Sequence, residues 1–112
     1  MTACTELARR LGKAIADSPE ATAYRAARDE LSADADLSQT LKDYQQQAQK
    51  IAQLEAEQKP VEVDDKHKLQ DLNAKLVAAD LFKKFTATQV EYVDLMRKVN
   101  QALRNELAVI EE

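Results

Sequence analysis

The chain has 112 residues, of which 19 are Ala, 1 is Gly, 2 are Pro and none is Trp. A chain of this length forms one domain. The scarcity of Gly and Pro leaves little room for the turns of a β-sandwich, a barrel or a doubly wound sheet. Charged residues make up 32% of the chain, and 20 acids against 16 bases give a formal net charge of −4. Composition therefore predicts a small, soluble, all-α protein.

Large apolar residues are few. Leu, Ile, Val and Phe together supply 25 of the 112 residues, which is near the level at which a chain is expected to be disordered. A domain of this size buries only about two-thirds of its unfolded surface, so Ala carries much of the packing. We therefore expect a thin core, with further apolar surface buried between protomers of a homo-oligomer, as a dimer or a larger assembly.

The compartment is predicted from three features. Glu6, Arg9, Arg10 and Lys13 interrupt the apolar residues near the start, so no signal peptide is expected. Because no apolar run approaches the roughly 18 residues of a membrane span, no membrane is expected as a partner. Cys4 is the one cysteine and has no internal disulfide partner, which fits a reducing compartment. These features predict a cytoplasmic protein.

The charge distribution argues against nucleic acid as a direct partner. Residues 1–59 and residues 60–112 each carry 8 bases and 10 acids, and no basic block is longer than a pair. Binding to phosphates needs a concentrated positive surface. The sequence predicts no such surface, and so no direct binding of nucleic acid.

Apolar periodicity predicts a first helix near 2–16. Pro19 ends this helix and suits the first turn of a second helix near 19–32, for which Ser18 is the expected N-cap. The apolar stripe of the first helix consists of Cys4, Leu7, Ala8, Leu11 and Ile15.

A third helix is predicted near 36–57, after a break at which Asp34 or Asp36 can act as the N-cap. Its apolar residues step by four and three, as in a short heptad seam, and the run 45–47 of three Gln is expected on the solvated side. The seam consists of Leu37, Leu41, Tyr44, Ala48 and Ile51.

Pro60 lies in the one long loop, 57–64, and Asp64 or Asp65 is the expected N-cap of a fourth helix near 65–79. The apolar pattern shifts register around Asp80, which predicts a kink or a short break there. A last helix near 81–110 follows, about 45 Å long at 1.5 Å per residue.

The predicted architecture is a single all-α domain over 1–112, with about five helices in antiparallel hairpins, a long C-terminal helix and assembly into an oligomeric helical bundle. The third and last helices carry the predicted contacts between protomers or with partners. These contact residues are Leu37, Leu41, Tyr44, Ile51, Phe82, Phe85, Tyr92, Met96 and Leu103.

Residues that could carry chemistry are isolated. His67 follows Asp64 and Asp65, but tight metal sites need three or four ligands with firm support, and acids at a helix start also serve as caps. Cys4 has no base nearby and is expected to be a small buried side chain. Gly12 lies inside the first helix, where it is expected to mark a close helix crossing. The sequence thus predicts no catalytic, cofactor-binding or metal-binding residue and no enzyme activity; a metal binder at Asp64, Asp65 and His67 is the weakest alternative.

The stretch Leu11–Glu20 (LGKAIADSPE), followed by Tyr24 and Leu31, is similar to the opening signature of the YlbF/YmcA family. The resemblance continues from 33 to 44 into the Gln-rich helix and includes the Val-Asn pair at 99–100. It covers the chain from about residue 7 to about residue 107.

This resemblance implies an all-helical, cytoplasmic, bacterial protein that self-associates. Well-known members of the family have no catalytic activity of their own. They assemble with relatives and a third protein into a complex that affects competence, sporulation and biofilm formation and is linked to RNA processing through RNase Y. Some members bind an iron–sulfur cluster through cysteines, including cysteines near the C-terminus. This sequence has only Cys4, so no cofactor is expected.

The sequence therefore predicts a non-enzymatic adaptor or regulator that acts through self-association and through contacts with proteins of the same family. The alternative is a structural or scaffolding oligomerisation module without a regulatory role.

Overall fold

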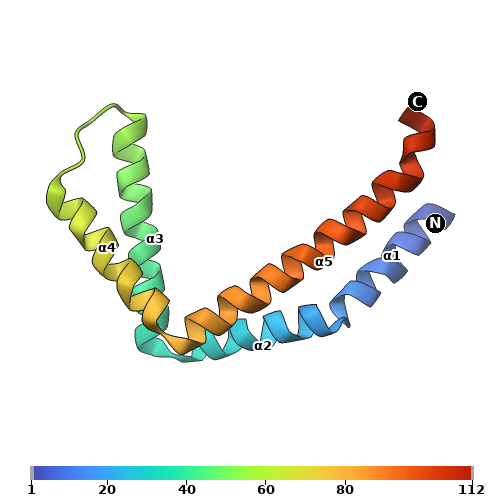
Figure 1. The fold of residues 1–112 in the computed structure, drawn as a ribbon, viewed down its shortest axis with the longest axis horizontal. Helices are drawn as coiled ribbons and strands as arrows, with labels where there is room; N and C mark the ends of the chain where they lie inside the picture. Colours follow the sequence, from blue (N-terminus) through green and yellow to red (C-terminus); the bar gives the residue numbers. More distant parts are fainter. Residues whose placement is uncertain (1, 112) are drawn as a thin grey trace. The chain divides into compact units, whose positions relative to one another are not determined.

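A computed structural model describes residues 2–111 and contains five α-helices (Figure 1). The described residues include no β-strand. The all-α prediction and the long C-terminal helix are therefore confirmed, and the predicted helix ends lie within two residues of the observed ones. The helices are α1 (Ala3–Ala16), α2 (Pro19–Ala33), α3 (Ala35–Ala56), α4 (Val63–Ala78) and α5 (Asp80–Glu111).

The junction between α1 and α2 follows from local capping chemistry. The Ser18 hydroxyl donates to the carbonyl oxygen of Ile15 at 2.6 Å and accepts from the backbone N–H of Ala21 at 3.2 Å. It therefore satisfies backbone groups at the end of one helix and the start of the next. Pro19 occupies the first position of α2, where its missing N–H has no cost. The predicted cap at Ser18 is confirmed.

Helix α3 begins and ends in recognisable caps. The Asp34 carboxylate accepts from the backbone N–H of Leu37 at 2.9 Å, so the first of the two predicted caps is the one used. At the other end Gln58 has φ 56°. Its N–H donates to the Glu55 carbonyl at 3.1 Å, and the N–H of Lys59 donates to the Leu54 carbonyl at 2.8 Å. This pair of bonds is a Schellman motif, in which Gln occupies the left-handed position that Gly favours.

The start of α4 differs from the prediction. Asp64 or Asp65 is the predicted N-cap, whereas Glu62 is the capping residue and makes no side-chain capping bond. Asp64 and Asp65 lie within the first turn, where negative charge is favoured by the helix dipole. The carboxylate of Asp65 is turned toward Gln47 and Lys50 of α3. This contact between helices explains why it does not cap its own helix.

The break predicted around Asp80 is confirmed. Helix α4 ends at Ala78, and Ala79 has an extended backbone with φ −81° and ψ 128°. Helix α5 starts at Asp80, which places an acid in its first turn.

The described chain divides into two compact units. One comprises residues 2–27 and 85–111, and the other comprises residues 28–84. In the second unit α3 packs against α4, and Figure 1 shows these helices side by side, joined by the loop 57–62. The single domain over 1–112 stays a prediction.

Few side chains among residues 2–111 are buried, which agrees with the predicted thin core. The buried apolar residues of the described chain are two alanines of α2, together with Leu31 and Leu76. Two local predictions are wrong. Cys4 is exposed, and a Cβ at Gly12 would meet nothing within 4 Å. Both lie on α1 with open space around them, so neither packs against another element as expected.

No helix within residues 2–111 is both long and apolar enough to cross a bilayer.

Candidate interaction surface

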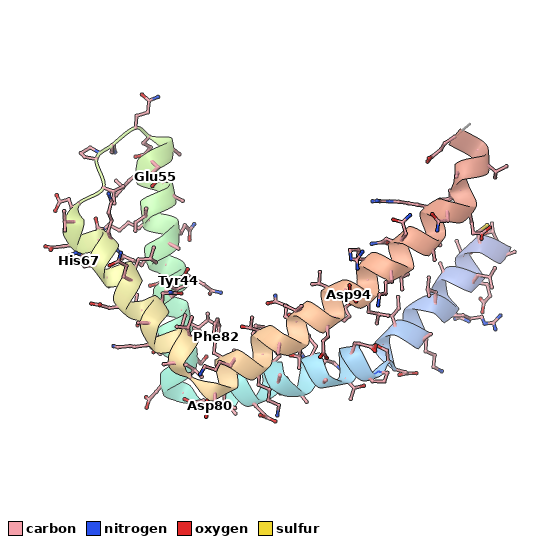
Figure 2. The ribbon with its side chains drawn as sticks, in the orientation of Figure 1. Tyr44, Glu55, His67, Asp80, Phe82 and Asp94 are labelled. Atoms are coloured by element: carbon pink, nitrogen blue, oxygen red, sulfur yellow. The ribbon has the colours of Figure 1, made fainter. Side chains whose placement is uncertain are left out.

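Four of the nine predicted contact residues lie on α3, where Figure 2 labels Tyr44. All four are half-buried within a single chain, and α3 also packs against α4. Some of their surface therefore remains accessible for a second molecule. Their contact role stays a prediction. The four are Leu37, Leu41, Tyr44 and Ile51.

Two predicted contact residues of α5 pack against the same chain. The rings of Phe85 and Tyr92 each lie 5.4 Å from the ring of Tyr24 on α2, at interplanar angles of 39° and 30°. Tilted aromatic pairs at this distance stabilise a fold by about 0.5–1.5 kcal/mol beyond their buried area. One edge of α5 is therefore occupied by α2 of the same chain. Phe85 and Tyr92 remain half-buried, so a further contact is still open to them.

A different edge of α5 is open to solvent. Val93 is 57% exposed, Leu103 and Leu107 are each 48% exposed, and Ile110 is 76% exposed. These large apolar side chains recur at helical spacing, so they form one exposed apolar strip along the helix. We call this edge the α5 seam; it consists of Val93, Met96, Asn100, Leu103, Leu107 and Ile110.

The seam is bordered by basic side chains. A shallow groove is lined by Val93, Met96 and Asn100 of the seam together with the neighbouring Arg97 and Arg104. Arg97 also donates to the Asp94 carboxylate at 2.6 Å. The seam thus combines an apolar strip with one positively charged edge.

Asp94, labelled in Figure 2, forms ion pairs with two basic side chains beside the seam. Its carboxylate pairs with Arg97, and Lys98 lies 3.1 Å from its other oxygen. Hydrogen bonds from Arg97 and then from Lys98 hold the pKa of the Asp94 carboxyl below its ordinary value. These are exposed pairs within one helix, so they orient the arginine more than they stabilise the fold.

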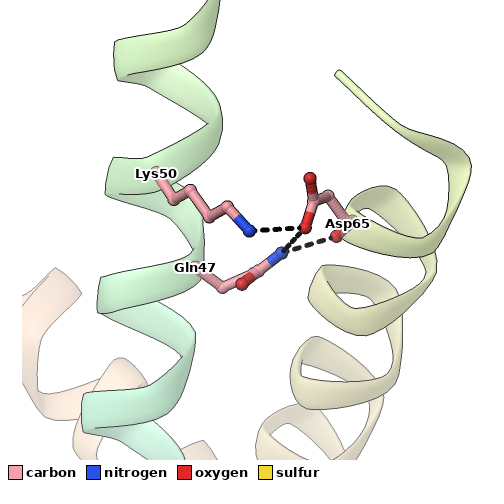
Figure 3. A network of polar contacts seen from close by, with 3 residues as sticks. All are labelled: Gln47, Lys50 and Asp65. Atoms are coloured by element: carbon pink, nitrogen blue, oxygen red, sulfur yellow. Dashed lines mark hydrogen bonds and ion pairs between the residues drawn. The ribbon is translucent and has the colours of Figure 1, made fainter.

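A polar network joins α3 to α4 (Figure 3). Gln47 donates to the backbone carbonyl of Asp65 at 2.9 Å and to its carboxylate at 3.3 Å, and Lys50 donates to the same carboxylate at 3.0 Å. The hydrogen bond from Lys50 and then that from Gln47 hold the pKa of the Asp65 carboxyl below its ordinary value. The network fixes the register of the two helices and so the position of the α3 residues.

Sequence reasoning missed Gln47. The run 45–47 of three Gln is predicted on the solvated side of the helix, but Gln47 is only 5% exposed. The available signal was its spacing, because Gln47 lies three residues after Tyr44 and four before Ile51, on the face that packs inward. A glutamine can be buried there because its amide finds the backbone carbonyl of Asp65.

Cys4 and His67 are the remaining candidates for chemistry. Cys4 and His67 are both exposed. Over the part of the chain that the structure describes, no group of three or more His, Cys, Asp or Glu side chains could hold a metal ion. Figure 2 shows His67 near the start of α4, away from the labelled Tyr44 of α3.

Comparison with known proteins identifies a family. No curated protein matches the chain. A family model described as control of competence regulator ComK, YlbF/YmcA, matches residues 5–108, which is nearly the whole chain. The all-helical fold agrees with the resemblance carried by residues 11–20 of the α1–α2 junction. The chain belongs to the YlbF/YmcA (Com_YlbF) family.

Proposed function

We propose that this protein is a non-enzymatic adaptor or regulator that acts through self-association and through contacts with other proteins. The observation that carries the proposal is the imbalance between buried and exposed apolar residues. Among residues 2–111 only four apolar residues are buried, and two of them are alanines, whereas nine large apolar side chains are exposed. A chain that exposes more large apolar side chains than it buries gains by covering them with a second protein.

The distribution of exposed residues favours α5 as the main contact element. Six of the nine lie on α5, and the predicted contacts Phe82, Met96 and Leu103 lie on the same helix. The α3 residues Leu37 and Tyr44 would supply a second, smaller contact area. Homo-oligomers and assemblies with relatives of the same family are the partners that fit this apolar, helix-on-helix surface.

Family membership supports a regulatory role. The family description concerns control of a competence regulator and names no reaction. In this proposal the protein is cytoplasmic, works without a cofactor, and takes part in processes such as competence, sporulation, biofilm formation and RNase Y-linked RNA processing. The alternative is a scaffolding module that oligomerises without regulating anything.

A genetic experiment separates the two roles. The chain would be deleted in its native host and replaced by the wild type or by Leu103→Glu, with Asn105→Glu as the control on another side of α5. A regulator predicts a change in competence or sporulation on deletion that the wild type and Asn105→Glu reverse and Leu103→Glu does not. Equal rescue by both variants would contradict a role for the α5 contact.

A further inference from the structure

The α5 seam has the spacing of a coiled coil. Its six residues step by three, four, three, four and three along the helix. In heptad terms the a positions are Val93, Asn100 and Leu107, and the d positions are Met96, Leu103 and Ile110. Five of the six are apolar, and the exception is an asparagine at a central a position.

The same chain occupies a neighbouring side of α5 and leaves the seam open. Tyr92 packs on Tyr24 of α2, and Leu95, which adjoins Asp94, shares a shallow hollow with Glu20 of α2. Tyr92 and Leu95 directly precede the a residue Val93 and the d residue Met96, so these contacts lie beside the seam and not on it. The seam is therefore a second apolar strip, separate from the one that holds the first unit together.

We propose that the seam binds the seam of a second copy of this chain, parallel and in register, with Asn100 facing the same residue of the other copy. The inference rests on the proposed function and makes it specific, because it names the face and the orientation. An asparagine at an a position destabilises the dimer when it faces an apolar residue of the other copy, because its amide is then buried without a hydrogen-bond partner. Against a second asparagine the two amides bond to each other and fix register and dimer state.

Charge favours the parallel arrangement. In a parallel pair Arg97 lies beside Tyr92 of the other copy, a favourable cation–ring contact, and Arg104 lies beside Val99. Only Glu106 and Glu111, at the end of the helix, bring like charges together. In an antiparallel pair with the same core, Arg97 would face Arg104 of the other copy twice, and Asn100 would face Leu103.

The size of the seam sets the expected strength. It runs from Val93 to Ile110, a length of about 25 Å at 1.5 Å per residue. With its flanking positions it engages about twelve residues of each copy, about half of a standard interface, and buries about 800 Å² in total. Interfaces of this size are transient, so the dimer is expected to dissociate in the micromolar range.

Cysteine crosslinking tests the face and the orientation together. In a Cys4→Ser background, Val93→Cys and Ile110→Cys are made separately at the two ends of the seam, and Asn105→Cys serves as an exposed control off the seam. Each protein is checked for helicity by circular dichroism and treated with a mild oxidant or a short bismaleimide. The parallel dimer predicts that each seam variant crosslinks to itself within minutes, at least about tenfold faster than Asn105→Cys.

Other outcomes overturn the proposal in distinguishable ways. Crosslinking only in a mixture of the two seam variants would show an antiparallel pair. A dimer by sedimentation without crosslinks at either seam position would leave self-association standing and refute this face, whereas a monomer at all concentrations would refute both. If Val93→Cys fails to fold, Ile110→Cys, at a position 76% exposed, carries the test alone.

The asparagine has its own test. Asn100→Leu is expected to tighten self-association by about tenfold and to broaden the mass distribution beyond the dimer. An unchanged mass and affinity would show that Asn100 does not lie in the interface.

Discussion

Replacement of Gln47 by alanine is expected to destabilise the fold by about 2 kcal/mol. The side chain is 5% exposed and donates to the Asp65 carbonyl at 2.9 Å. Loss of one such hydrogen bond costs about 0.5–1.5 kcal/mol, and loss of a buried methylene adds about 0.8 kcal/mol. Gln47→Met keeps the aliphatic part and removes only the hydrogen bonds of the amide to Asp65, so it should cost about 1 kcal/mol.

Urea unfolding followed by circular dichroism measures these differences. All variants are compared at one protein concentration, because self-association raises the apparent stability. Gln46→Ala is the matched control on the exposed side of the same turn and should change the free energy of unfolding by no more than about 0.5 kcal/mol. If Gln47→Ala were no more destabilising than Gln46→Ala, the network between α3 and α4 would not stabilise the fold as described.

Three further predictions concern caps and charge. Gln58→Gly should stabilise the protein by about 0.5–1 kcal/mol in thermal or urea unfolding, because Gly adopts the left-handed backbone at φ 56° without strain; a loss of stability would contradict the cap assignment. Ser18→Ala should cost about 1 kcal/mol, since it removes the hydroxyl that serves both α1 and α2, and an unchanged midpoint would refute that role. The lowered pKa of Asp65 means that its contribution is present above the unfolded value of about 3.9 and is lost as pH falls through the lower folded value. The free energy of unfolding of Asp65→Asn should therefore fall less between pH 5 and pH 3 than that of the wild type. Equal pH profiles for the two proteins would show that the Asp65 carboxylate makes no such contribution to stability.

The helix junctions were predictable because their chemistry is local. Ser18 with Pro19, and Asp34 before its helix, satisfy backbone groups within four residues of themselves. The start of α4 was not predictable in this way. The Asp65 carboxylate is held by Lys50, fifteen residues earlier, and a competition between a local cap and a distant partner is invisible to local sequence patterns.

The candidate surface was predicted only in outline. Apolar spacing placed contacts on α5, but it did not divide that helix into an edge facing Tyr24 and an open seam. That division depends on where α2 lies. The errors at Cys4 and Gly12 have the same cause, since burial and close approach are set by neighbouring elements that periodicity does not locate.

Self-association is the central claim, and sedimentation equilibrium across the micromolar range tests it most directly. We predict a helical protein whose mass rises with concentration to at least twice the 12.6 kDa of the chain, and which Leu103→Glu returns to the monomer mass. A folded, helical protein that stays at 12.6 kDa at every concentration would contradict the account.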